Sequence, residues 1–98
     1  MTSKERASWR AKANQLEPLF QSGKGGVSEA LIKQTDDALR ARELIKIRVL
    51  LETTPETPKA IAATLAAATH SEVIQVIGGS IVLYRYNEEL HKKDAKKR

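Results

Sequence analysis

The chain has 98 residues, of which 41% are hydrophobic and 30% are charged, a composition typical of one globular domain. It has no cysteine and only two histidines, His70 and His91, so disulfides and thiolate metal sites are excluded and a structural zinc site is implausible. Its apolar runs are too short for a membrane span, and the polar start MTSKERASWR lacks the apolar segment of a secretion signal. We therefore expect a cytoplasmic protein without a metal or cofactor.

The net charge of +5 is unevenly distributed along the chain. Residues 1–50 contain ten Lys and Arg against six Asp and Glu, residues 51–90 contain two against five, and residues 91–98 contain five against one. A basic first half and a basic end favour a polyanionic partner such as nucleic acid. Charge alone fits a solvated surface with a solubilising tail equally well.

The first predicted elements are a helix and a short strand. Trp9, Ala13 and Leu16 follow one another at i, i+4 and i+7, which predicts a helix over residues 3–16. Pro18 ends this helix, and the next four residues, LFQS, are a strand candidate.

A second helix and a second strand follow. Ser28 is a good N-cap, with Val27 and Ile32 placed as a hydrophobic staple, and the helix should reach about Arg42. The sequence LIKIRVLLE, residues 44–52, alternates between apolar and polar positions and predicts a strand.

The last part of the chain predicts a helix and a β-hairpin. In TTPETP, Thr57 before Pro58 is the favoured helix start and Thr54 is the competitor, with the helix ending near Thr69. The β-branched runs VIQVI and IVLYRY flank a Gly-Gly pair, which is typical of a tight hairpin turn.

The expected fold is therefore a two-layer α/β domain of order α-β-α-β-α-β-β with a mixed four-stranded sheet. Residues 1–87 form the domain, and residues 88–98 are expected to be a disordered basic tail. The helices should cover one face of the sheet, which carries Ile45, Ile47, Val49, Ile74, Val76, Ile81 and Leu83. On the other face, Lys46 and Arg48 beside Tyr84 and Tyr86 could form a platform for single-stranded bases, although strand tyrosines are more often packing residues.

A glycine-rich loop lies between the first predicted strand and the second helix. Gly23, Lys24, Gly25 and Gly26 form a G-x-x-G pattern, in which bare backbone N–H groups, the helix start and the lysine can converge on a phosphate. The alternative is that the glycines only permit a tight turn. The loop has neither the GK[ST] ending of a P-loop nor a dinucleotide fingerprint, and no catalytic triad spacing occurs, so we expect no enzyme activity.

Several segments together resemble a known family. PLFQSGKGG, ELIKIRVL and EVIQVIGGSIVLYR, with their spacing, are similar to the CRM (chloroplast RNA splicing and ribosome maturation) domain, and in particular to its bacterial single-domain YhbY-like members. The resemblance extends from about Thr2 to Tyr86. It implies RNA binding during assembly of the large ribosomal subunit, through the glycine loop and a basic first helix. The helix departs from the family pattern in being less basic and less apolar, with Ala7, Ser8 and Lys12 at unusual positions.

The predicted function is thus that of a monomeric RNA-binding protein with no small-molecule substrate and no membrane partner. The alternative is a protein-interaction module that docks a ribosomal or RNA-processing protein through the exposed sheet face. The predicted RNA-binding residues are Gly23, Lys24, Gly25, Gly26, Lys4, Arg6, Arg10, Lys46 and Arg48.

Overall fold

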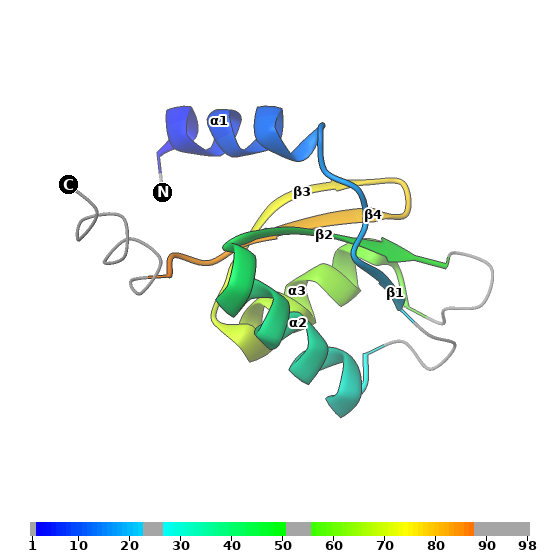
Figure 1. Ribbon diagram of the computed structural model, residues 1–98. Helices are drawn as coiled ribbons and strands as arrows, with labels where there is room; N and C mark the ends of the chain where they lie inside the picture. Colours follow the sequence, from blue (N-terminus) through cyan, green and yellow to red (C-terminus); the bar gives the residue numbers. More distant parts are fainter. Residues whose placement is uncertain (1, 23–26, 51–55, 88–98) are drawn as a thin grey trace.

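The computed structural model describes residues 2–22, 27–50 and 56–87, which form three helices and one four-stranded sheet (Figure 1). In chain order the elements are α1 (Ser3–Ala13), β1 (Phe20–Ser22), α2 (Glu29–Arg42), β2 (Leu44–Val49), α3 (Pro58–Thr69), β3 (Glu72–Ile77) and β4 (Ser80–Tyr84). The predicted α/β class and element order are confirmed. The glycine loop (23–26), the end of the predicted second strand (51–52), the competing helix start at Thr54 and the basic tail (88–98) lie outside the described residues.

Polar caps determine where the helices begin. The side chains of Thr2, Ser28 and Thr57 accept hydrogen bonds from the backbone N–H three residues further on, each at 3.1 Å. Each bond satisfies one of the free N–H groups of a first helical turn. Two of these caps, Ser28 and Thr57, were predicted and are confirmed.

The sheet is mixed, with strand order β1-β2-β4-β3. β1 pairs in parallel with β2, as the β1-α2-β2 connection requires, and β4 lies antiparallel between β2 and β3. The predicted hairpin is confirmed: β3 and β4 pair around a turn in which Gly78 has a φ of +54°, a conformation that glycine adopts without strain.

One face of the sheet is covered by α2 and α3 (Figure 1). The buried residues of this core are Leu31, Leu39, Ile45, Ile47, Val49, Ile61, Ala62, Leu65, Ile81 and Leu83. Six of the seven predicted inward-facing strand residues belong to this face, with Val76 partly buried against it. Apolar alternation in the strands therefore predicted this face well.

The opposite face carries α1, so the sheet is covered by helices on both sides (Figure 1). Here Ala13 is buried with Leu44, Ile74 and Val82, and Trp9, Leu16 and Tyr84 pack around them. The prediction of two layers, with one face open, was wrong in this respect. Three consecutive buried residues in β4, Ile81, Val82 and Leu83, place apolar side chains on both faces, which requires a cover on each.

A β-bulge explains one misplaced residue. The pairing of β3 with β4 shifts between Val73 and Gln75, so Ile74 joins the smaller core under α1 instead of the core under α2 and α3. After an extra residue in one strand, the positions that face a given side of the sheet change from odd to even. A regular period of two cannot predict that change.

Arg85 ties the end of β4 to the two helices of the main core. Its guanidinium donates to the Asp36 carboxylate at 2.6 Å and to the Thr69 carbonyl at 2.8 Å, and a further bond reaches the Asp36 carbonyl at 3.1 Å. The hydrogen bond from Arg85 to the Asp36 carboxylate is the main reason why the pKa of this carboxyl lies below its usual value. The same carboxylate also pairs with Arg40 at 3.1 Å, one helical turn further along α2.

Candidate nucleic-acid interface

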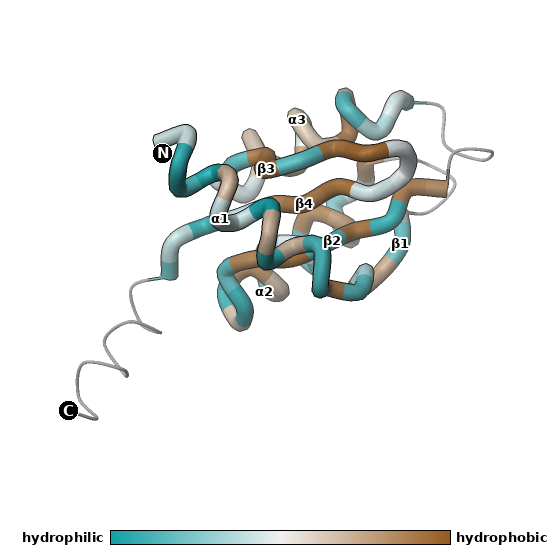
Figure 2. The backbone as a smooth tube through the Cα atoms, turned by 90° about the horizontal axis from the view of Figure 1, so that it is seen from above, coloured by the Kyte–Doolittle hydropathy of each residue, from teal (hydrophilic) through white to brown (hydrophobic). Residues whose placement is uncertain are grey.

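Helix α1 crosses the sheet from one side to the other. It contacts β3 through Arg6 and β4 through Trp9, and the segment that follows it reaches β2, where Lys46 Nζ donates to the Leu16 carbonyl at 3.4 Å. Figure 2, seen from above, shows this path and the mostly hydrophilic character of the helix. The start of α1 therefore lies over β3, its middle over β4, and the segment after it over β2.

Arg6 is engaged with the edge strand β3. Its guanidinium donates to the Val73 carbonyl at 2.5 Å and forms an ion pair with Glu72 at 3.5 Å. These contacts give Arg6 a role in docking α1. Its predicted RNA contact stays a prediction, as do those of Lys4 and Arg10, both of which are exposed on the same helix.

Tyr84 does not offer an open stacking surface, contrary to the platform considered from the sequence. The Trp9 ring covers it, with the two ring centroids 4.3 Å apart and the planes inclined by 28°. Burial of its phenol raises the pKa of Tyr84 above the usual value of 10.0. Tyr86, by contrast, is 58% exposed beyond the end of β4.

Lys46 and Arg48 lie on the α1 side of β2. Their neighbours Ile45, Ile47 and Val49 are buried under α2 and α3, so alternation directs the two cations to the other face. Lys46 is partly buried beneath the segment that follows α1, whereas Arg48 is exposed. The two positions are two residues apart, roughly 7 Å along the strand.

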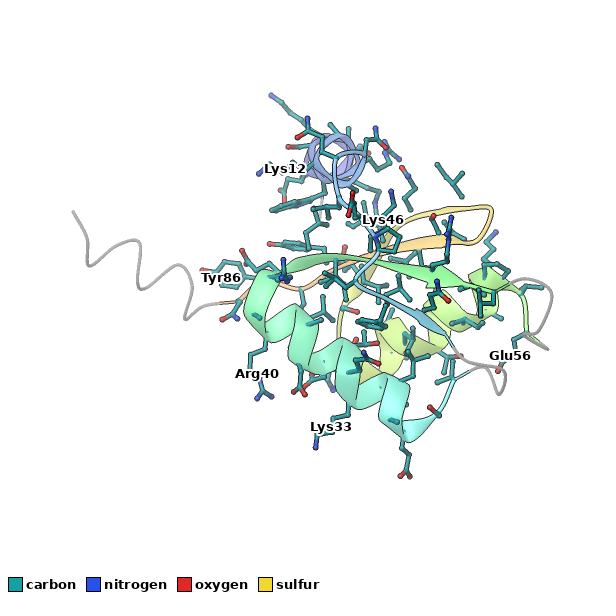
Figure 3. The ribbon with its side chains drawn as sticks, turned by 45° about the vertical axis from the view of Figure 1, so that its right-hand side comes forward. Lys12, Lys33, Arg40, Lys46, Glu56 and Tyr86 are labelled. Carbon is teal, nitrogen blue, oxygen red and sulfur yellow. The ribbon has the colours of Figure 1, made fainter. Side chains whose placement is uncertain are left out.

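A groove opens at the start of β2, beside α1 and the end of α2. It has a volume of about 560 Å³ and is lined by Trp9, Lys12, Gln15, Leu16, Glu17, Leu19, Arg42, Leu44, Ile45 and Lys46. Lys12 extends over the Trp9 ring with its Nζ 4.7 Å from the centroid (Figure 3). Lys12 and Arg42 were not among the predicted RNA-binding residues. The sequence does show that Lys12 lies on the opposite flank of α1 from Arg6 and Arg10, which could have separated it from them. No pattern in the sequence indicates that Arg42 lines the same groove.

The glycine loop joins two described elements that fix where it starts and ends. β1 ends at Ser22, which is paired with Val49 at the carboxyl end of β2, and Ser28 caps the start of α2. The loop therefore follows the strand end of a β-α unit and precedes the positive end of a 14-residue helix, as predicted.

The predicted site is thus divided between two parts of the molecule. Lys46 and Arg48 lie on β2, next to the strand that leads into the glycine loop. Arg6 lies at β3, the opposite edge of the sheet, which is three strand spacings or roughly 14 Å from β1.

Other kinds of site find little support in the described ranges. Residues 2–22, 27–50 and 56–87 contain no group of three or more His, Cys, Asp or Glu that could hold a metal ion. No helix in these ranges is long and apolar enough to cross a membrane.

Comparison with known proteins shows the family of the chain. The sequence model of the CRS1/YhbY (CRM) domain matches residues 1–85. The chain belongs to the CRM domain family. This CRM protein is 44% identical over 89 residues to the probable RNA-binding protein YqeI of Bacillus subtilis, covering 91% of this chain and 92% of the relative.

Two further relatives extend the comparison. The probable RNA-binding protein MJ0652 of Methanocaldococcus jannaschii is 42% identical over 98 residues, which covers 99% of this CRM protein and 72% of the relative. The solution structure of SAV1595 from Staphylococcus aureus superposes with a TM-score of 0.77 at 46% identity, covering 90% of this chain and 91% of that one. The family resemblance and the α/β class with a mixed four-stranded sheet, both expected from the sequence, are therefore confirmed.

Proposed function

We propose that this CRM protein binds RNA, and specifically ribosomal RNA during assembly of the large ribosomal subunit. RNA binding is supported by the family and the surface together. Relatives are named as probable RNA-binding proteins, and β2 presents the cations Lys46 and Arg48 beside the strand that leads to the glycine loop. The ribosomal target follows from the CRM resemblance. The role is one of binding without catalysis, in the cytoplasm and as a monomer.

The proposed contacts follow the edge of the sheet formed by β1 and β2. Backbone N–H groups of Gly23, Gly25 and Gly26, the Lys24 ammonium and the start of α2 would hold one phosphate. Arg48 and Lys46 would hold further phosphates along β2. The RNA backbone would then run along β2 from its carboxyl end, beside the glycine loop, towards the start of the strand.

Protein docking through an open sheet face is a weaker candidate. The face that this alternative needs carries α1, which buries Leu44, Ile74 and Val82. Salt dependence still separates the two functions, because phosphate contacts make affinity fall steeply with salt and an apolar protein interface does not.

The test is a binding titration of large-subunit ribosomal RNA at several salt concentrations with Lys24→Asp. The matched control is Lys59→Asp, which makes the same charge change on an exposed residue at the start of α3. We expect Lys24→Asp to weaken binding about tenfold, which requires only ~1.4 kcal/mol, and to lower the salt slope by roughly 0.7 for each single-stranded phosphate that the variant no longer binds. Equal effects of the two variants would refute the loop as a phosphate site.

A further inference from the structure

The groove at the start of β2 combines an aromatic wall with a positive rim. Its lining residues among those described include three cations, Lys12, Arg42 and Lys46, and one carboxylate, Glu17. The chain's single tryptophan, Trp9, forms part of the wall. Cations that surround an aromatic surface match the chemistry of a nucleotide, whose phosphate is anionic and whose base has a flat face.

The Trp9 ring contacts two side chains of the protein. Tyr84 stacks on it at 4.3 Å, and Lys12 Nζ lies 4.7 Å from the same centroid. Two groups at these heights cannot share one face of a ring, so Lys12 covers the face that Tyr84 leaves open. An exposed cation–π contact is weaker than the stacking of a base on an aromatic side chain. A base can therefore displace the Lys12 ammonium, which is then free to contact the phosphate of the same nucleotide.

The groove is separate from the glycine loop but lies on the same edge of the sheet. The loop follows the strand that pairs with Val49, whereas the groove is lined by Leu44 and Lys46 at the other end of β2. Leu44 and Val49 are five residues apart, roughly 17 Å along the strand. Lys46 belongs to the groove, and Arg48 lies between Lys46 and the strand end near the loop, so two cationic side chains of β2 connect the two places.

We propose that this groove binds one unpaired nucleotide of the RNA, with its base against Trp9 and its phosphate held by Lys12, Arg42 and Lys46. The inference rests on the proposed RNA-binding function and adds a preference for RNA with an unpaired residue. A base inside a duplex is stacked on its neighbours and presents no free face, so a fully paired RNA cannot fill the groove.

The experiment uses the full chain and two RNA probes of equal length, a single-stranded ten-residue oligoadenylate and a perfectly paired ten-base-pair duplex. Fluorescence of Trp9 reports on stacking, because no other tryptophan contributes. Lys12→Gln and Arg42→Gln remove one groove cation each. Lys33→Gln is the matched control, since Lys33 is exposed on the outer side of α2 and points away from the sheet (Figure 3).

We expect the single strand to quench Trp9 fluorescence and the duplex to leave it unchanged. Lys12→Gln and Arg42→Gln should each weaken binding of the single strand about three- to tenfold and lower its salt slope by roughly 0.7, while Lys33→Gln binds as the wild type does. If the wild-type protein binds RNA but its fluorescence is unchanged and both groove variants bind normally, the groove proposal is wrong and RNA binding stands. If the wild-type protein binds neither probe nor ribosomal RNA, the proposed function itself is wrong.

Discussion

The two faces of the sheet differ in how densely they are covered. Under α2 and α3, ten of the described residues are buried in one apolar core, whereas four are buried under α1. The first face has two amphipathic helices and well-capped ends, and it accounts for most of the apolar burial. The second face has one short, mostly polar helix, and beside it lie the groove and the exposed cations of β2. The denser face thus stabilises the fold, and the thinner face leaves surface available for a ligand.

The largest expected effect is on the dense face. Leu65→Ala removes a fully buried side chain of α3 and leaves a cavity that close packing cannot fill, so we expect a loss of about 2 to 5 kcal/mol in the free energy of unfolding. Urea denaturation measures it, with Ala63→Ser on the exposed side of α3 as control, where about 0.5 kcal/mol or less is expected. RNA affinity of the folded fraction should not change. A loss below 1 kcal/mol would show that this core is loosely packed.

The second effect concerns the ion pair that joins the dense face to the end of β4. Asp36→Asn leaves the guanidinium of Arg85, whose side chain is only 22% exposed, without its charged partner. Because hydrogen bonds between charged groups are the stronger ones, we expect a loss of about 1 to 3 kcal/mol at neutral pH. Asp37→Asn is the matched control, because it removes the same charge from the adjacent exposed position. Equal losses for the two variants would mean that only net charge matters.

The pH dependence of this pair has a definite sign. The pKa of Asp36 is lower in the folded protein than its usual value of 3.8, so its contribution is fully present above that value and is lost as the pH falls through the lower, folded value. The stability difference between wild type and Asp36→Asn should therefore shrink as the pH is lowered from 5 towards 2. Urea denaturation at several pH values measures this difference, and one that stays constant would contradict the assignment.

The third effect tests the thin face. Trp9→Ala removes the stack on Tyr84 from a partly buried position, and we expect a loss of about 1 to 2 kcal/mol, with Trp9→Phe retaining most of the stability. Hydrogen exchange should accelerate mainly in the amides of α1, because this helix can detach while the core under α2 and α3 stays intact. If all regions exchange faster by the same factor, the two faces unfold as one unit and the contrast between them fails.

The sequence predicted local features well and long-range ones poorly. Helix starts at Ser28 and Thr57, the hairpin turn and the alternation of β2 depend on neighbouring residues, and all are confirmed. The position of α1 depends on which sheet face remains uncovered, and the stripe of Trp9, Ala13 and Leu16 contains no information about that. The run of apolar residues in β4 is a local pattern that does indicate burial of both faces.

The candidate site shows the same division. The pattern G-x-x-G between a strand and a capped helix can be found in the sequence, as can the two cations of β2. The groove depends on contacts between residues about 30 positions apart, such as Lys46 with Leu16, and on the second flank of α1, which carries Lys12. The partner of Arg85 is 49 residues away, so no local pattern could have predicted it.

The smallest expected effect separates two roles for the basic first helix. Arg6→Gln removes the hydrogen bond to the Val73 carbonyl and the ion pair with Glu72, for an expected loss of about 0.5 to 1.5 kcal/mol in stability. Since the Arg6 guanidinium is already bonded to β3, at the edge of the sheet away from β1, RNA affinity should change less than about twofold and the salt slope should stay the same. Lys12→Gln on the other flank of α1 should do the reverse, with weaker RNA binding and little loss of stability. The same salt series and thermal melts measure both variants. If Arg6→Gln lowers the salt slope by roughly 0.7 while the protein stays folded, Arg6 contacts phosphate as the sequence predicted, and the RNA reaches both edges of the sheet.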